Sequence, residues 1–143
     1  KAGKNAQITD DFMIIARIES LILEAGMDDA LLRAKEYVKA GSDAIMIHSR
    51  KKDPREIYEF CDKFRSFDNK TPLVVVPTSF NEASEDELAS HGVNIVIYAN
   101  QLTRSAFLAM QGTAKDILLN HRAKEVDDRL MPIKDIISLI EPL

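Results

Sequence analysis

Arg17 and His48 close two successive apolar runs of the sequence, and together they could bind an anion. Arg17 ends the run "FMIIAR", which begins at Phe12, and His48 ends the run "DAIMIH", which begins at Asp43. A guanidinium offers a planar fork of donors that matches phosphate or carboxylate, and an imidazole can add a further donor. If the two runs are adjacent parallel strands, both side chains reach the same edge of a sheet and could hold one small anion.

Two other interpretations of these side chains stay open. Arg17 could form a structural ion pair with Glu19 or another carboxylate at the same edge, and His48 could be a structural histidine whose ring nitrogens are already hydrogen-bonded. Further polar residues stand at or just after the ends of apolar runs: Glu19, Ser49, Thr78, Ser79, Tyr98 and Asn100.

Four apolar runs predict the strands that position these residues. Two were given above, and the others are "PLVVVPT" from Pro72 and "NIVIYAN" from Asn94. None alternates polar with apolar residues, which is typical of parallel strands that are covered on both faces.

Amphipathic patterns between the runs predict helices. After the first run, one helical face carries Ala30, Leu31, Ala34, Tyr37 and Val38. After the second, Asp53 is the expected N-cap, with Pro54 at the first helical position and Glu56 completing a capping box. That helix should turn Ile57, Phe60, Cys61 and Phe64 inward. Ser84 and Glu87 predict another capping box, and a long helix is expected from about residue 102 to 119.

The repeated βα pattern fits part of a barrel. The runs end at intervals of about 23 to 31 residues, and an eight-unit (β/α)8 barrel of about 250 residues has about 31 residues per unit. We therefore predict an α/β fold of four βα units plus a C-terminal helix, the second half of a (β/α)8 TIM-type barrel. An open doubly wound sheet is the alternative. In either fold the ligand site lies at the carboxyl ends of the strands.

Composition excludes several other classes of protein. The 143 residues carry a formal net charge of -4, which argues against a nucleic-acid partner. No apolar run is long enough to cross a membrane, so no membrane partner and a cytoplasmic location are expected. Cys61 is the single cysteine and falls on an apolar helix face, which favours a structural role. The sequence has no glycine-rich phosphate loop and no zinc-ligand spacing.

From about residue 11 to 140 the sequence resembles the phosphoenolpyruvate mutases of the isocitrate lyase superfamily. The most specific segments are "ARIES", "AGSDAIMIHS" and "VVVPT". The resemblance implies a (β/α)8 barrel that uses Mg²⁺ to interconvert phosphoenolpyruvate and phosphonopyruvate, the entry step of phosphonate biosynthesis. Arg17 then matches an arginine on the phosphoryl group, His48 matches a substrate-binding histidine, and Glu19 matches a supporting carboxylate.

The resemblance also implies what lies outside this chain. The Mg²⁺ ligands, the phosphoryl-accepting aspartate and the gating loop belong to the first half of such a barrel, so no metal ligand is expected here and the chain alone should be inactive. The alternatives are a phosphonopyruvate hydrolase or another lyase of the superfamily and, from a different class, a non-catalytic α/β binding or assembly module.

Residues 1–143 are interpreted as one unit, the C-terminal half of a barrel domain. Residues 1–10 are expected to end a preceding helix or linker, and residues 131–143 to form the additional C-terminal helix. That helix carries Ile133, Ile136, Ile137 and Ile140 on one face. Members of the superfamily exchange helices between subunits, so the resemblance implies a homo-oligomer in which this face is covered.

Overall fold

The computed structural model describes residues 1–140, and within it the chain divides into two compact units. The first comprises Lys1–Ala99 and the second begins at Asn100. The interpretation of residues 1–143 as one unit, the C-terminal half of a barrel domain, stays a prediction.

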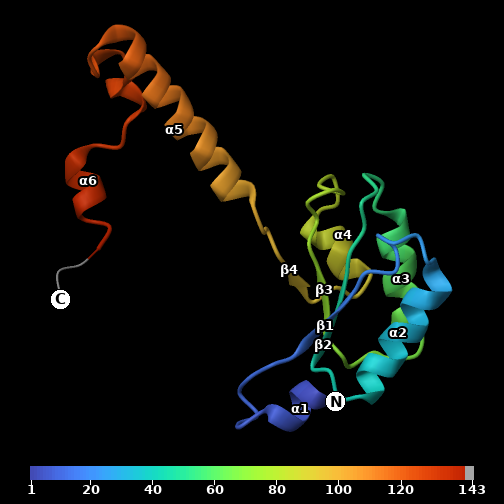
Figure 1. The fold of residues 1–143 in the computed structure, drawn as a ribbon. Coiled ribbons are helices and arrows are strands. Elements are labelled where there is room, and N and C mark those ends of the chain that lie inside the picture. The colour runs from blue at the N-terminus through green and yellow to red at the C-terminus, as the bar shows by residue number, and fades with distance from the viewer. Residues whose placement is uncertain (141–143) are drawn as a thin grey trace. The chain divides into compact units, whose positions relative to one another are not determined.

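The first unit has the predicted βα order (Figure 1). Its strands form one parallel sheet in the order β1-β2-β3-β4, so each strand pairs with the next along the chain. The strands are shorter than the apolar runs that predicted them, and the ends of each run lie in loops. The elements are α1 (Ala2–Ala6), β1 (Ile15–Ile18), α2 (Met27–Lys39), β2 (Ala44–Ile47), α3 (Arg55–Arg65), β3 (Leu73–Val75), α4 (Glu85–Ser90) and β4 (Ile95–Val96).

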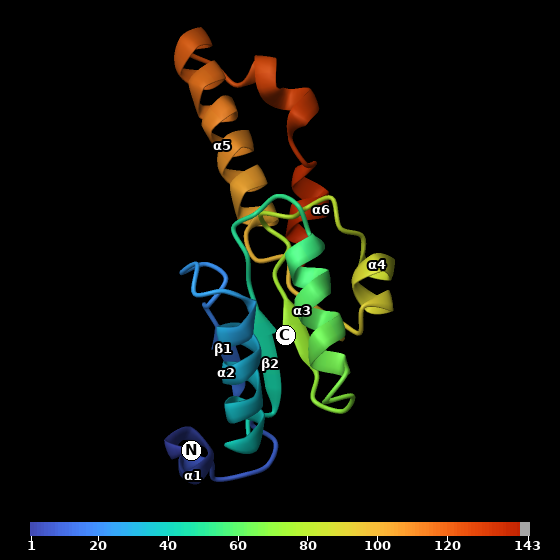
Figure 2. The same ribbon diagram turned by 90° about the vertical axis from the view of Figure 1, so that its right-hand side faces the viewer.

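One face of the sheet is covered by helices. Figure 2 shows α2 and α3 in front of the strands, and one core cluster joins the helices to this face. It includes Ile18, Ile45, Ile47, Leu73 and Val75 from the strands and Ala30, Ala34, Ile57, Phe60, Cys61 and Phe64 from the helices. The inward faces predicted for both helices are therefore confirmed, with Leu31, Tyr37 and Val38 partly buried against the same cluster.

The strand residues that alternate with these core residues point to the other face of the sheet. Arg17 lies opposite Met46 in the register of β1 and β2, and Val74 lies opposite Met46 on β3. Strands in chain order with right-handed crossovers place successive helices on the same side of a sheet. A doubly wound sheet instead reverses its strand order and has helices on both faces. The topology therefore supports the barrel unit, in which the second face lines the interior.

The helix starts partly follow the sequence prediction. Ser84 and Glu87 form the predicted capping box at α4. At α3 the capping-box prediction is wrong: the helix begins at Arg55 after Pro54, and the N–H of Arg55 donates to Asp53 Oδ1 at 2.9 Å. The carboxylate of Glu56 instead contacts Ser49 and Lys51, because the β2–α3 loop, to which both residues belong, brings them close to the first turn of the helix.

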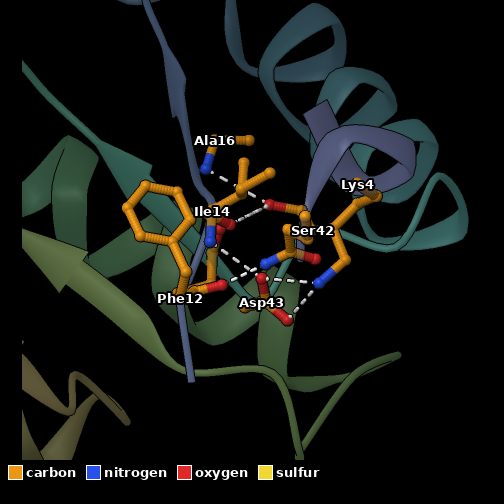
Figure 3. Close-up of polar contacts among 8 residues, drawn as sticks. Lys4, Phe12, Ile14, Ala16, Ser42 and Asp43 are labelled. Carbon is orange, nitrogen blue, oxygen red and sulfur yellow. Dashed lines mark hydrogen bonds and ion pairs between the residues drawn. The ribbon is translucent and has the colours of Figure 1, made fainter. Parts of the chain in front are cut away.

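Polar contacts tie the chain together at the amino ends of β1 and β2 (Figure 3). Asp43 accepts from Lys4 Nζ at 2.8 Å and from the N–H of Ile14 at 2.8 Å. The hydroxyl of Ser42 accepts from the N–H of Ala16 at 3.2 Å. The Ile14 N–H and, to a smaller extent, Lys4 hold the pKa of Asp43 below its usual range. This end of the sheet is built for stability, as is usual at the amino end of barrel strands.

The second unit consists of α5 (Gln101–Asn120), η1 (Lys124–Arg129) and α6 (Ile133–Ile137). The long helix is confirmed. The predicted helix over 131–143 is only partly correct, since α6 has five residues and residues 141–143 lie outside the described part. Ile133, Ile136, Ile137 and Ile140 are 74%, 53%, 70% and 82% exposed, so this segment has no covering surface of its own. No helix in residues 1–140 is long and apolar enough to span a bilayer.

Candidate functional site

The carboxyl ends of β1 and β2 bring Arg17, Glu19 and His48 to the helix-free face of the sheet. Arg17 pairs with Met46 in the register, and His48 follows Met46 by two residues on the same face. Ile18 pairs with Ile47, so Glu19 and His48 occupy equivalent positions one residue beyond the strands. The charges of Arg17 and Glu19 both act on the pKa of His48, as expected for neighbouring groups.

Arg17 forms the ion pair with Glu19 that the sequence left open. The side chains are 48% and 41% exposed, so the pair contributes little to stability. Within residues 1–140 the guanidinium bonds to Glu19 through Nε alone. Its two terminal nitrogens keep their donors and could make the bidentate contact that suits a phosphoryl or carboxylate group.

His48 does not have the satisfied ring of a structural histidine. Its Nδ1 is buried and has no hydrogen-bond partner among the described residues. Partial burial lowers the pKa of His48 below its ordinary value, the positive charge of Arg17 lowers it further, and Glu19 opposes the shift. The ring is therefore neutral near pH 7, with one nitrogen as donor and the other as acceptor.

The other polar residues expected at the strand ends have different surroundings. Ser49 is fully buried, and its hydroxyl donates to Glu56. Tyr98 donates to Glu85 Oε1 at 2.8 Å, and Asn100 Oδ1 accepts from Arg104 at 3.4 Å. Ser49 and Asn100 therefore bond to the helix that follows each of them, and Tyr98 bonds to the helix that precedes it. Within residues 1–140 the side chains of Thr78 and Ser79 make no hydrogen bond.

Sequence reasoning missed a second polar group beside β1. Ser20 is 2% exposed and donates to Asp29, which also accepts from Arg33. Arg17, Ser20, Asp29 and Arg33 all line a cavity of about 250 Å³. The only available signal was the recurrence of a serine two residues beyond two successive strands, in "IES" and "IHS".

The side chains of residues 1–140 do not fit a Mg²⁺ site on their own. In residues 1–140 no group of three or more His, Cys, Asp or Glu side chains could hold a metal ion. Glu19 lies at the rim of the sheet, which is the edge formed by the carboxyl ends of the strands, and its carboxylate is paired with Arg17. Burial raises the pKa of Cys61 to about 12, so its thiol is protonated at neutral pH and is not activated as a nucleophile.

Sequence comparisons show which proteins this chain resembles. The family model described as phosphoenolpyruvate phosphomutase matches residues 1–118. A phosphoenolpyruvate phosphomutase of Tetrahymena pyriformis is 36% identical over 139 residues, which are 97% of this chain and 45% of that protein. A phosphonopyruvate hydrolase of Variovorax is 40% identical over 139 residues, or 96% of this chain and 47% of that protein.

Solved structures show the same relation. A phosphoenolpyruvate phosphomutase of Streptomyces platensis superposes with a TM-score of 0.91 at 36% identity, over 96% of this chain and 47% of that one. A phosphonopyruvate hydrolase in complex with oxalate and Mg²⁺ superposes with a TM-score of 0.87 at 40% identity, over 96% of this chain and 48% of that one. The chain thus spans about half the length of the relatives it matches, and the predicted fold class is confirmed. The chain belongs to the phosphoenolpyruvate phosphomutase family.

Proposed function

We propose that this chain supplies the second half of a phosphoenolpyruvate phosphomutase barrel, which interconverts phosphoenolpyruvate and phosphonopyruvate when complete. The observation that carries the proposal is the placement of Arg17 and His48. They lie together on the helix-free face of a sheet that superposes on half of a phosphomutase. The chain alone is expected to be inactive, because its rim has donors for an anion but no complete reaction site.

Arg17 and His48 suit the binding of a transferring phosphoryl group. Catalysis of phosphoryl transfer depends mainly on positioning and on positive charge around the transferring group. The terminal nitrogens of Arg17 would bind its oxygens, and neutral His48 would donate one hydrogen bond. Glu19 would hold the guanidinium through Nε. The isomerisation moves no proton, so none of these residues has to be a general base.

We further propose that the complete enzyme uses Mg²⁺ held by the part of the barrel outside this chain. The hydrolase relative solved with Mg²⁺ supports this proposal. When bound, the metal would supply positive charge beside the phosphoryl and enolate oxygens.

Phosphonopyruvate hydrolysis is the second candidate activity. It is favoured by the 40% identity to the Variovorax hydrolase, compared with 36% to the phosphomutases. Arg17 and His48 would bind the same substrate in either reaction, so the rim alone does not distinguish them.

Phosphorus NMR of the complete protein with phosphonopyruvate and Mg²⁺ tests the proposal. A phosphomutase forms phosphoenolpyruvate, whereas a hydrolase releases inorganic phosphate. Phosphate as the sole product would refute the mutase proposal. A non-catalytic module would give neither product and would not bind phosphonopyruvate or oxalate.

We also propose that the complete protein is a homo-oligomer in which helices are exchanged between subunits. The exposed isoleucines of residues 133–140 support this arrangement, since they form an apolar surface that the described residues leave uncovered.

A further inference from the structure

The loops after β1 and β2 each contain a buried serine, and the two serines occupy equivalent positions. Because Ile18 pairs with Ile47, Ser20 and Ser49 both lie two residues beyond the paired strand ends. Each directly follows a rim residue, Glu19 in one loop and His48 in the other. Ser20 and Ser49 are 2% and 0% exposed, and they are the only buried polar side chains in the part of the chain that is described.

The first serine bonds to a carboxylate at the start of the next helix. Ser20 Oγ donates to Asp29 Oδ2 at 2.6 Å, and Asp29 stands in the first turn of α2. Arg33 Nε donates to the same oxygen at 2.7 Å. The bonds from Arg33 and then Ser20 hold the pKa of Asp29 below its usual range, so the carboxylate is ionised at neutral pH.

The second serine has the same kind of partners. Ser49 Oγ donates to Glu56, which stands in the first turn of α3 and has a side chain only 14% exposed. Lys51 Nζ forms an ion pair with Glu56, and the N–H of Lys51 donates to Ser49 Oγ at 3.0 Å. Each set therefore consists of a buried serine, a first-turn carboxylate and a cation.

We propose that Ser20–Asp29–Arg33 and Ser49–Glu56–Lys51 are two copies of one positioning device for the proposed anion site. Each serine ties the backbone directly after a rim residue to the helix that follows. Glu19 and His48 are thereby held at the end of their strands although they lie in loops, and Glu19 in turn holds Arg17. These six are positioning residues, since a rigid supporting shell is what keeps site residues in a productive geometry.

The ring signals of histidine in the 143-residue chain test this role without any catalytic assay. With labelled histidine, the His48 resonances are identified by their loss in His48→Gln. In Ser49→Ala, we expect the His48 signals to move and its titration midpoint to rise toward about 6.5 as the ring becomes more solvated. His91, which bonds to Asp62 at 2.7 Å and stacks on Tyr58, serves as the internal reference and should stay unchanged.

Matched variants separate positioning from folding. Ser66→Ala removes an exposed hydroxyl that bonds to the carbonyl of Lys63, and it should leave the His48 signals unchanged. Unchanged His48 signals in a folded Ser49→Ala chain would overturn the proposal, as would equal changes at His48 and His91. If Ser49→Ala does not fold, Glu56→Ala, which removes the acceptor of the Ser49 hydroxyl, decides by the same criterion.

The other copy has an equivalent readout. Ser20→Ala should shift the Nε–H signal of Arg17 and leave that of Arg65 unchanged, because Arg65 Nε donates to the carbonyl of Gly92 at the amino end of the sheet. An unchanged Arg17 signal would overturn the proposal for Ser20, Asp29 and Arg33. In the complete enzyme Ser49→Ala should also lower kcat/KM about tenfold. This last measurement alone rests on the proposed function, so a failure of that function leaves the spectroscopic result intact.

Discussion

Replacement of Arg65 by methionine should destabilise the sheet at its amino end. Arg65 donates to the carbonyl of Gly92 from Nε at 3.0 Å and from Nη2 at 2.7 Å. Nη1 donates to the carbonyls of Asp68 at 3.1 Å and Thr71 at 2.8 Å. The side chain therefore ties the end of α3 to the loops that precede β3 and β4.

The expected loss follows from these contacts. Methionine keeps most of the apolar stem but has no donor, so three partly buried carbonyl groups lose their partners. At about 1 kcal/mol for each carbonyl, the free energy of unfolding should fall by about 3 kcal/mol. Lys63→Met is the matched control, because Lys63 lies on the same helix in an exposed ion pair with Glu59. It should cost about 0.5 kcal/mol or less.

Urea unfolding followed by circular dichroism measures both variants. The reasoning would be refuted if Arg65→Met were no more destabilising than Lys63→Met. Folded Arg65→Met should also keep the His48 ring signals of the natural chain, because its contacts lie at the opposite end of the sheet. Gly92→Ala adds a check, since its Cβ would lie 2.7 Å from Arg65 Nε at a residue whose φ is +84°.

Three further predictions concern the thiol, the pH dependence and the assembly. Cys61 should react with a thiol reagent at pH 8 only as fast as the chain unfolds, because burial raises its pKa to about 12; rapid labelling of the folded chain would contradict this. The pKa of His48 is lowered in the folded chain, so as pH falls the imidazole binds a proton first in the unfolded chain. The contribution of His48 to stability is therefore complete above about pH 6.5 and is lost as pH falls through the folded-state pKa. His48→Gln should flatten this dependence in urea titrations, and an equally steep dependence would refute it. The exposed isoleucines of residues 133–140 predict an oligomer of the complete protein in sedimentation experiments, and a monomer at micromolar concentration would be inconsistent with helix exchange.

Much of the first unit could be predicted because its elements have strong local patterns. Parallel strands are covered on both faces, so Ile45 and Ile47 stand in a continuous apolar run. The inward face of α3 follows the helical period, and its Ile57, Phe60 and Phe64 are fully buried. The neighbouring positions of Arg17 and His48 followed from strand order alone.

Contacts that depend on tertiary structure could not be predicted in the same way. Glu56 has the spacing of a capping box, but Ser49 and Lys51 bind its carboxylate because the β2–α3 loop brings them close. The carbonyl partners of Arg65 are spread over three loop residues, which no periodic pattern connects. The apolar period of residues 133–140 predicted a longer helix than the five residues of α6, whose exposed isoleucines gain no burial within the described chain.

The kinetics of Arg17→Ala and His48→Ala in the complete protein, measured beside a thermal melt of each variant, test the central claim most directly. Loss of the guanidinium should remove a charge-assisted contact worth about 3 kcal/mol in the transition state, which lowers kcat/KM more than about a hundredfold. His48→Ala should cost less, because a neutral donor is lost. Both variants should melt like the natural protein, since both side chains lie at the rim of the sheet. Full activity in either variant, or unfolding without a specific kinetic defect, would contradict the proposed anion site.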